Sequence, residues 1–261
     1  MSALVQEFKP SDNLKPYTEW YWAGNFNARQ NGNGHIDDMS WRVIPNGYLE
    51  LILHLTDHHC DLPKSNGWSQ SPDYTLMGLY TRPYDVLFSR NVKVFGIRFK
   101  PEGIHNLFGL PASEFTGEYE DMSLVLGKEF RNFCDRIREE KSIPAMLQMA
   151  EKYLLQNLCK NNIELNYVNH AAELIRKSNG MLRIEDLPEK LYISLRQLER
   201  GFKHRIGISP KHYLRISRLN EVHRLLERNH HLNLTQLAYQ LGYADQAHFI
   251  NDFKSIIGEK P

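Results

Sequence analysis

The chain has 261 residues, which favours two domains over one because single domains usually contain about 100–200 residues. Apolar residues make up 41% and charged residues 24%, which is typical of a globular protein and argues against a disordered or membrane-embedded chain. The formal charge of +1 conceals an asymmetry, because from residue 181 onward there are thirteen Lys and Arg against nine Asp and Glu. This basic excess favours an anionic partner at the carboxyl end.

The amino terminus and the cysteines indicate in which cellular compartment the protein is expected. Residues 1–14 lack the basic-then-apolar pattern of a signal peptide, and no stretch approaches the roughly eighteen uninterrupted apolar residues of a membrane helix. Cys60, Cys134 and Cys159 lack paired metal-site spacing and fit free thiols in a reducing compartment. We therefore expect a cytoplasmic protein with no membrane partner.

Residues 15 to 100 are predicted to form short strands separated by turns. The segment from Tyr48 to Leu55 alternates, with four leucines on one face. Turn signals stand at Pro45-Asn46-Gly47 and at Arg82-Pro83. Residues 56–73 are expected to form a long, mobile loop. The expected strands are Glu19–Phe26, Met39–Ile44, Tyr48–Leu55, Tyr74–Tyr80 and Val92–Phe99. Such a series is typical of a barrel or a sandwich.

One short segment gathers several potential metal ligands, namely His54, Asp57, His58, His59 and Cys60. Imidazoles and a thiol suit zinc or copper. However, adjacent His58 and His59 would point to opposite sides of a strand, so exposed loop histidines are the preferred interpretation. We predict no metal site and no cofactor. The sequence also has no Ser-His-Asp order and no glycine-rich phosphate loop, and it gives no positive evidence for an enzyme.

Aromatic and polar side chains of the predicted strands are candidates for a small-molecule pocket. Barrel interiors lined in this way commonly bind small molecules, although each residue could equally be plain core. The candidates are Trp20, Trp22, Trp41, Tyr48, Glu50 and Arg98.

From Pro101 onward the pattern becomes helical. Periodicity predicts helices over 102–108, 128–139, 145–159 and 164–177, which would pack on the barrel or form a dimer seam. We therefore expect a β-barrel domain over residues 1–125, a helical linker or dimerisation region over 126–163, and a helical domain over 164–261.

Residues 184–204 have the pattern of a helix-turn-helix. Ser194 is a suitable N-cap for a helix from Leu195 to His204, because its hydroxyl accepts a hydrogen bond from a first-turn amide. Leucine and phenylalanine fall on one side of that helix and basic residues on the other. A charged face alone is more often a solvated surface. Arginines one turn apart also suit a DNA major groove, where the guanidinium matches guanine. The candidate DNA-binding residues of this unit are Ser194, Arg196, Gln197, Arg200 and Lys203.

The same unit recurs fifty-one residues downstream, where Phe253-Lys254 corresponds to Phe202-Lys203. Two copies indicate a duplicated module, because a solenoid needs at least about three. Asp245 takes the capping place of Ser194. The outward set of this second helix is less basic and comprises Gln246, Ala247, His248, Asn251 and Lys254.

A long helix is predicted between the copies. Ser209 and Pro210 form a strong helix start, and the apolar pattern continues to about Asn229. Such a helix would be roughly 28 Å long, close to the roughly 34 Å of one DNA turn. One chain would then read two successive major grooves without a partner subunit.

Residues from about 165 to 261 resemble the DNA-binding domain of the AraC/XylS family of transcription regulators. The resemblance is carried by Leu198-Glu199-Arg200-x-Phe202-Lys203, by Gly207-x-Ser209-Pro210 and by residues 242–249. It implies base contacts from the front of each recognition helix. Three positions depart from the family pattern: Pro188 and Tyr192 replace a small residue and a turn glycine, and Asn251 replaces a commonly basic residue. The first helix is therefore expected to be short, and the second recognition helix to bind more weakly.

The amino-terminal region is similar to the sensing domain of a subset of the same regulators, for which a cupin-like β-barrel is the expected form. The residues that support this similarity are Trp22, residues 44–47, Gly78, Arg82-Pro83 and residues 96–103. This resemblance does not identify a ligand.

Together these observations predict a two-domain α+β protein with a cupin-like barrel, following helices and a tandem helix-turn-helix. The predicted function is that of a bacterial, sequence-specific DNA-binding transcription regulator whose amino-terminal domain senses a small molecule or mediates dimerisation. Expected partners are double-stranded DNA, a small-molecule effector, a second copy of the chain and, for an activator, RNA polymerase. Two alternatives stay open: an interaction protein that antagonises other regulators without DNA, and a cupin-type metal enzyme with a DNA-binding tail.

Overall fold

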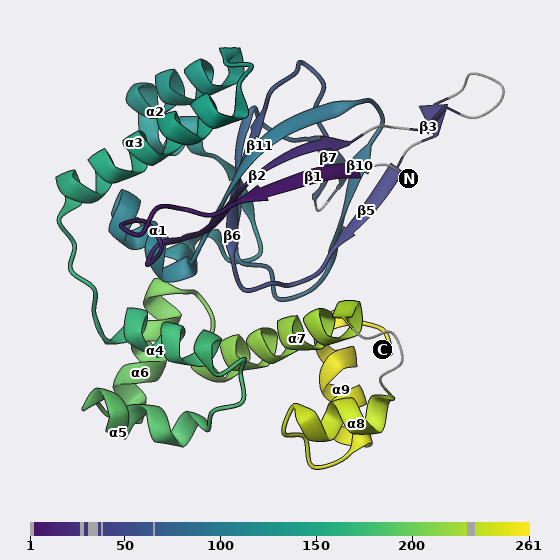
Figure 1. The fold of residues 1–261 in the computed structure, drawn as a ribbon, viewed down its shortest axis with the longest axis vertical. Helices are drawn as coiled ribbons and strands as arrows, with labels where there is room; N and C mark the ends of the chain where they lie inside the picture. Colours follow the sequence, from purple (N-terminus) through teal and green to yellow (C-terminus); the bar gives the residue numbers. More distant parts are fainter. Residues whose placement is uncertain (1–2, 27–28, 31–35, 38, 65, 229–232) are drawn as a thin grey trace.

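The computed structural model describes residues 3–26, 29–30, 36–37, 39–64, 66–228 and 233–261. The fold is α+β with two domains: antiparallel sheets and helices form the first, and helices alone form the second (Figure 1). No helix in the described part of the chain is both long and apolar enough to cross a membrane.

The larger sheet has six antiparallel strands in the order β1-β2-β11-β6-β9-β12. These strands are β1 (Ala3–Phe8), β2 (Thr18–Phe26), β11 (Val92–Phe99), β6 (Leu49–His54), β9 (Tyr74–Met77) and β12 (Tyr119–Asp121). A second sheet has the order β5-β10-β7-β8, with β5 at Met39–Val43, β10 at Tyr84–Phe88, β7 at Asp61–Lys64 and β8 at Gly67–Gln70. The short β3 (Arg29–Gln30) and β4 (Ile36–Asp37) pair with each other.

Two expectations for this domain are wrong. The described strands form separate sheets that do not close into a barrel, so the arrangement is a sandwich of unequal sheets. Residues 56–73 are not a structureless loop, because they contain the β7–β8 hairpin. Gly67, the first residue of β8, pairs with Lys64 and adopts a φ of 118°, a conformation that favours glycine.

Strand alternation divides the apolar residues between two cores. Trp22 and Phe26 of β2 face the smaller sheet, where they share a core with Val86 and Phe88 of β10. Leu49, Leu51 and Leu53 of β6 face the helices, as the alternation predicts. The Trp22 indole lies directly over Gly96 of β11: a Cβ at that position would be 2.1 Å from the ring. Any other residue there would displace the tryptophan.

Helices cover the outer face of the larger sheet. They are α1 (Pro101–Phe108), the 3-10 turn η1 (Ala112–Phe115), α2 (Met122–Glu139) and α3 (Ile143–Asn161). Figure 1 shows α2 and α3 side by side against the sheet. α2 is kinked at Gly127, whose φ of 73° breaks the helical conformation. The helix predicted from periodicity covers only residues 128–139, because the kink at Gly127 interrupts the apolar pattern of α2.

The carboxyl-terminal domain comprises α4 (Tyr167–Lys177), η2 (Ile184–Asp186), α5 (Leu187–Leu191), α6 (Leu195–Arg205), α7 (Pro210–Arg228), α8 (Leu234–Gln240) and α9 (Gln246–Ile257). Its first half shares one continuous apolar cluster with the sheet and α1–α3. The second half has its own core, against which Ile44 of the first domain packs. Both halves therefore rest on the amino-terminal domain.

Candidate nucleic-acid interface

The first recognition helix, α6, has the N-cap and the separate apolar and basic faces that the sequence predicts. The Ser194 hydroxyl accepts a hydrogen bond from the Gln197 amide at 3.1 Å, and the Gln197 side chain accepts one from the Ser194 amide at 3.2 Å. This reciprocal capping box fixes the start of the helix. Leu198, Gly201 and Phe202 are buried. The outward residues Ser194, Arg196, Gln197, Arg200 and Lys203 are all exposed.

A glycine lets α6 approach α4 closely. A Cβ at Gly201 would lie 2.5 Å from the Tyr167 hydroxyl and 2.8 Å from Cγ2 of Val168. The two helix backbones therefore pack tightly along this line, which holds α6 with its basic face outward.

The turn before α6 departs from the expected glycine without losing its geometry. Tyr192 adopts the left-handed conformation, with φ 54° and ψ 43°, and its side chain is 96% exposed. A tyrosine in this region is strained, since glycine is the residue that tolerates positive φ. Pro188 lies in the first turn of α5, where proline is tolerated. The helix is only five residues long.

The second recognition helix, α9, has the same construction. The Asp245 carboxylate accepts a hydrogen bond from the His248 amide at 2.7 Å and caps the helix. Phe249 and Phe253 are buried. Gln246 is half-buried and accepts a hydrogen bond from Thr235 of α8 at 2.8 Å. The remaining predicted contacts, Ala247, His248, Asn251 and Lys254, are exposed.

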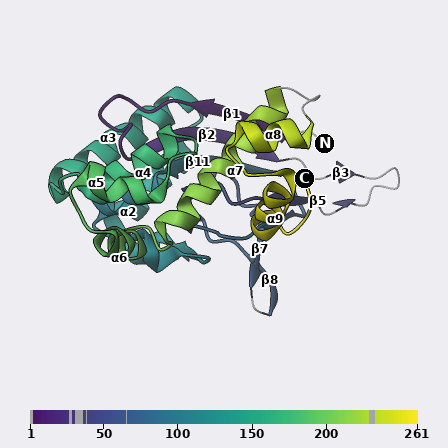
Figure 2. The ribbon, with the colours of Figure 1, turned by 90° about the horizontal axis from the view of Figure 1, so that it is seen from below.

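The helix α7 connects the two units. Figure 1 shows α6 near the start of α7 and α9 near its end, and Figure 2 shows the same separation from below. The Ser209 hydroxyl accepts a hydrogen bond from the His212 amide at 3.2 Å, which caps α7 as predicted. With 19 residues, α7 spans roughly 28 Å at about 1.5 Å per residue.

Hydrogen bonds of Asp252 hold α9 against α7. Asp252 of α9 accepts hydrogen bonds from Arg215 of α7 at 2.5 Å and from the Tyr243 hydroxyl at 2.8 Å. The Arg218 guanidinium lies 4.9 Å from the centre of the Tyr243 ring. Both arginines therefore have partners within the domain.

Neither the small cavity beside Glu50 nor the larger cavity beside Trp20 is lined by all six predicted pocket residues. Trp22 is core, and Trp41 packs edge-on against Phe26 with ring centres 6.0 Å apart. Arg98 forms an ion pair with Glu50 at 2.8 Å, and its guanidinium lies 5.9 Å from the Tyr48 ring.

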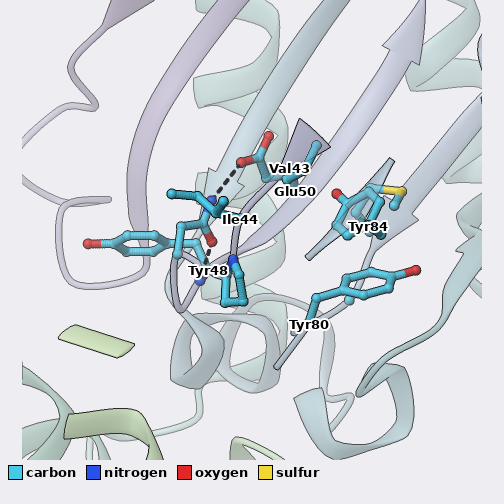
Figure 3. Close-up of a pocket in the computed structure, with 10 residues that line it drawn as sticks. Val43, Ile44, Tyr48, Glu50, Tyr80 and Tyr84 are labelled. Atoms are coloured by element: carbon cyan, nitrogen blue, oxygen red, sulfur yellow. Dashed lines mark hydrogen bonds between the residues drawn. The ribbon is translucent and has the colours of Figure 1, made fainter. Parts of the chain in front are cut away.

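The interior cavity near Glu50 is too small for an effector. It measures about 20 Å³, room for little more than a water molecule. Figure 3 shows Tyr80 and Tyr84 on one side of it, with the Tyr48 ring pointing away from both. Instead, Tyr48 and Trp20 line a second, larger cavity between the domains.

The histidine segment divides into a buried and an exposed part. His54 and His59 stack with ring centres 4.3 Å apart, and Nε2 of His54 lies 3.7 Å from the Cys60 sulfur and 3.2 Å from the Ser71 hydroxyl. Burial lowers the pKa of His54 to about 4 and raises that of Cys60. The expectation of exposed loop histidines is therefore wrong for His54 and His59, while Asp57 and His58 are exposed. Within the described residues, no cluster of three or more His, Cys, Asp or Glu side chains could hold a metal ion.

No sequence pattern indicated the contacts between the domains. Arg176 of α4 pairs with Glu102 of α1, and its Nη1 donates to the Tyr213 hydroxyl at 2.7 Å. Asn220 of α7 donates to the Asn46 carbonyl at 2.6 Å. Arg42 of β5 donates to the carbonyl of Ile257, the last residue of α9, at 3.3 Å. Contacts between residues this far apart in the chain leave no periodic signal.

Comparison with known proteins gives a separate assignment to each domain. Residues 6–121 match the family described as "Domain of unknown function (DUF6597)", and residues 187–261 match one described as "Helix-turn-helix domain". The Msm operon regulatory protein of Streptococcus mutans is 29% identical over 115 residues, which cover 43% of this chain and 41% of that protein. The HTH-type transcriptional activator RhaS of Salmonella paratyphi B is 28% identical over 122 residues, which cover 45% and 41%.

The matched region thus spans about two fifths of the length of these relatives. Among solved structures, ToxT from Vibrio cholerae aligns with a TM-score of 0.49 and 14% identity, covering 100% of this chain and 97% of that one. The family match, the capped helices and the repeated unit of this chain agree, so residues 187–261 are a helix-turn-helix domain, and they follow a region that matches DUF6597 in the same chain.

Proposed function

We propose that the protein is a sequence-specific DNA-binding transcription regulator in which α6 and α9 enter successive major grooves of one duplex. The observation that carries this proposal is that both helices have one buried apolar face and one exposed polar face. Each recognition helix buries its apolar face, and the side chains expected to meet DNA are exposed, apart from the half-buried Gln246. Two capped helices near the ends of one long helix suit two grooves about one turn apart.

The two recognition helices would contribute differently. Arg196, Arg200 and Lys203 give α6 three cations, whereas Lys254 is the only one in the corresponding set of α9. Lys203 already donates to the Gly207 carbonyl at 2.9 Å, so the guanidinium groups are the better candidates for guanine edges. Affinity would come chiefly from phosphate neutralisation and would fall steeply with salt. Base preference would be stronger in the half-site read by α6.

The amino-terminal domain would sense a small molecule or mediate pairing with a second copy. Both halves of the DNA-binding domain contact this first domain, so a change in its shape would reach both recognition helices. If the regulator is an activator, RNA polymerase would be a further partner.

The test is selection of bound duplexes from a random DNA pool with the full chain. We expect enrichment of a site with two conserved blocks about one helical turn apart, the block read by α6 being the more strongly conserved. A footprint on that site should cover both blocks. If no sequence is enriched over the starting pool at low salt, the proposed function is wrong.

A further inference from the structure

The turn between α5 and α6 holds a tyrosine in a strained conformation that no contact within the protein explains. Tyr192 has φ 54° and ψ 43°, and its side chain is 96% exposed. Among the described residues, its ring and hydroxyl have no hydrogen bond and no ring contact. The other two non-glycine residues with positive φ in the described part of the chain are Asn162 and Asn179. Asparagine is several-fold enriched in the left-handed region, whereas a bulky residue there is an outlier.

The repeated unit supplies an internal comparison for this position. The amide after Tyr192 donates to the Pro188 carbonyl at 3.0 Å, and the amide after Gly242 donates to the Ala238 carbonyl at 3.0 Å. Both scaffold helices therefore end with the same closing hydrogen bond, and Gly242, with φ 73°, holds the place of Tyr192. The second unit has one more residue between this place and its N-cap. Glycine is thus sufficient for this turn, and its geometry does not require a tyrosine.

Tyr192 lies beside the residues predicted to meet DNA. One residue separates it from Ser194, so the two Cα atoms are at most about 7 Å apart. Residues 190–198 contain two cations, Lys190 and Arg196, and no acidic residue. Figure 1 shows α5 at the lower left, on the side of the carboxyl-terminal domain away from the sheets. A duplex that receives the start of α6 in its major groove would bring a phosphate strand past this turn, because such a strand borders the groove.

The chemistry of the side chain suits that strand. Tyrosine hydroxyls are among the groups that donate hydrogen bonds to DNA phosphates, and such contacts set the position of a protein on the duplex. The ring offers apolar surface to a deoxyribose. Leu195, the first residue of α6, is 44% exposed and extends this surface. Because the hydroxyl is neutral, the contact would release no counterion.

We propose that Tyr192 binds the sugar-phosphate strand beside the groove entered by α6, with its hydroxyl donating to a phosphate oxygen. The inference rests on the proposed function, because it adds a contact to the same DNA-binding surface. The strain in the turn is then the cost of a contact that positions Arg196 and Arg200 over the bases, since strained residues gather at functional sites. Gly242 offers no equivalent contact, so α6 would be anchored more firmly than α9.

The experiment uses the full chain and the variants Tyr192→Gly and Tyr192→Phe. Fluorescence anisotropy measures affinity for the duplex selected by the parent and for a shuffled duplex, over a series of salt concentrations. Tyr192→Gly should raise the Tm without DNA by about 2–4 °C, because glycine relieves the strain, and should weaken DNA binding at least about tenfold. Tyr192→Phe keeps the ring and should weaken binding about tenfold, the effect of one lost hydrogen bond to a charged group.

Asn162→Gly is the matched control. It places glycine at another left-handed position, the C-cap of α3, and should leave DNA binding unchanged. Both Tyr192 variants should weaken the selected and the shuffled duplex by the same factor, because a phosphate contact carries no sequence information. The slope of affinity against salt should also stay at the parental value.

The phosphate itself can be located by replacing single phosphates of the α6 block with neutral methylphosphonates. At one position the replacement should weaken binding of the parent about tenfold more than binding of Tyr192→Phe. Equal losses for parent and variant at every position would overturn the inference.

Three other results would overturn it: a lower Tm in Tyr192→Gly, unchanged affinity in both Tyr192 variants, or an altered preference at one base pair. Unchanged DNA affinity together with reduced transcription in a reconstituted assay would assign the side chain to a protein partner instead. A parent that enriches no DNA loses the proposed function and this contact together. A parent that enriches DNA, with variants that bind it equally well, retains the function and loses only the contact.

Discussion

Arg176 of α4 donates hydrogen bonds to both carboxylate oxygens of Glu102 in α1, and this ion pair joins the two domains. The Glu102 side chain is 1% exposed and that of Arg176 is 15% exposed. The guanidinium also donates to the Tyr213 hydroxyl of α7. One arginine therefore ties the amino-terminal domain to the helix that connects both helix-turn-helix units.

Arg176→Met should lower the free energy of unfolding by about 3–5 kcal/mol, because it leaves the Glu102 carboxylate buried without a partner. Urea unfolding followed by circular dichroism measures the loss. The double variant Arg176→Met/Glu102→Leu should recover most of it, since no buried charge remains. Lys177→Met is the control: its pair with Glu173 is exposed and should contribute less than about 1 kcal/mol. Equal losses in Arg176→Met and Lys177→Met would contradict this assignment.

Stability should fall as the pH drops from about 6.5 to about 4 because of His54. Burial holds the pKa of this histidine at about 4, below its ordinary value of 6.5, so the unfolded chain takes up a proton that the folded chain excludes. The contribution is fully present above pH 6.5 and is lost as the pH falls toward 4, with a size on the order of 3 kcal/mol. His59, Cys60, Asp73 and Arg138 are ionisable groups around this site.

Urea unfolding at several pH values, for the parent and for His54→Gln, measures this effect. The variant should lose most of the slope between pH 6.5 and 4. His58→Gln is the matched control, since His58 is exposed, and it should keep the parental slope. An unchanged slope in His54→Gln would assign the acid sensitivity to other groups.

The caps of the two recognition helices should matter about equally for stability. Ser194→Ala and Asp245→Ala each remove a side-chain acceptor from a first-turn amide and should cost about 1 kcal/mol. Both should also weaken DNA binding, because the capped turn precedes the predicted base contacts. Ser11→Ala, whose hydroxyl makes no hydrogen bond among the described residues, should be neutral. A loss in Ser11→Ala as large as in the cap variants would rule out this explanation.

Arg200→Ala should relax sequence preference and not merely weaken binding. A bidentate arginine contact supplies roughly 1–3 kcal/mol of discrimination at one base pair. Selection with the variant should therefore show reduced conservation at one position of the α6 block, while the α9 block is unchanged. Lys152→Ala removes an exposed cation from α3 and should leave both blocks intact. An identical selected site for Arg200→Ala and parent would exclude this role.

Local patterns predicted the carboxyl-terminal domain well because its architecture is local. Caps such as Ser194 and Asp245 act on amides three residues away, and the buried faces of α6 and α9 follow helical periodicity. The same holds for β6, where alternation alone assigns the leucines to one face. In contrast, the sequence could not decide between a barrel and a sandwich, because sheet closure depends on which strand edges meet.

The sequence by itself determined that two capped, amphipathic units repeat at the carboxyl end and that strands precede them, since each of these features depends on neighbours within a few residues. Only the tertiary structure decided that the sheets stay open, that His54 is buried beside Cys60, and that Trp20 and Tyr48 meet α7 in a cavity between the domains. These features depend on residues up to nearly two hundred positions apart, such as Trp20 and Ser217. Such contacts are selected by the packing of whole elements, which no local pattern records.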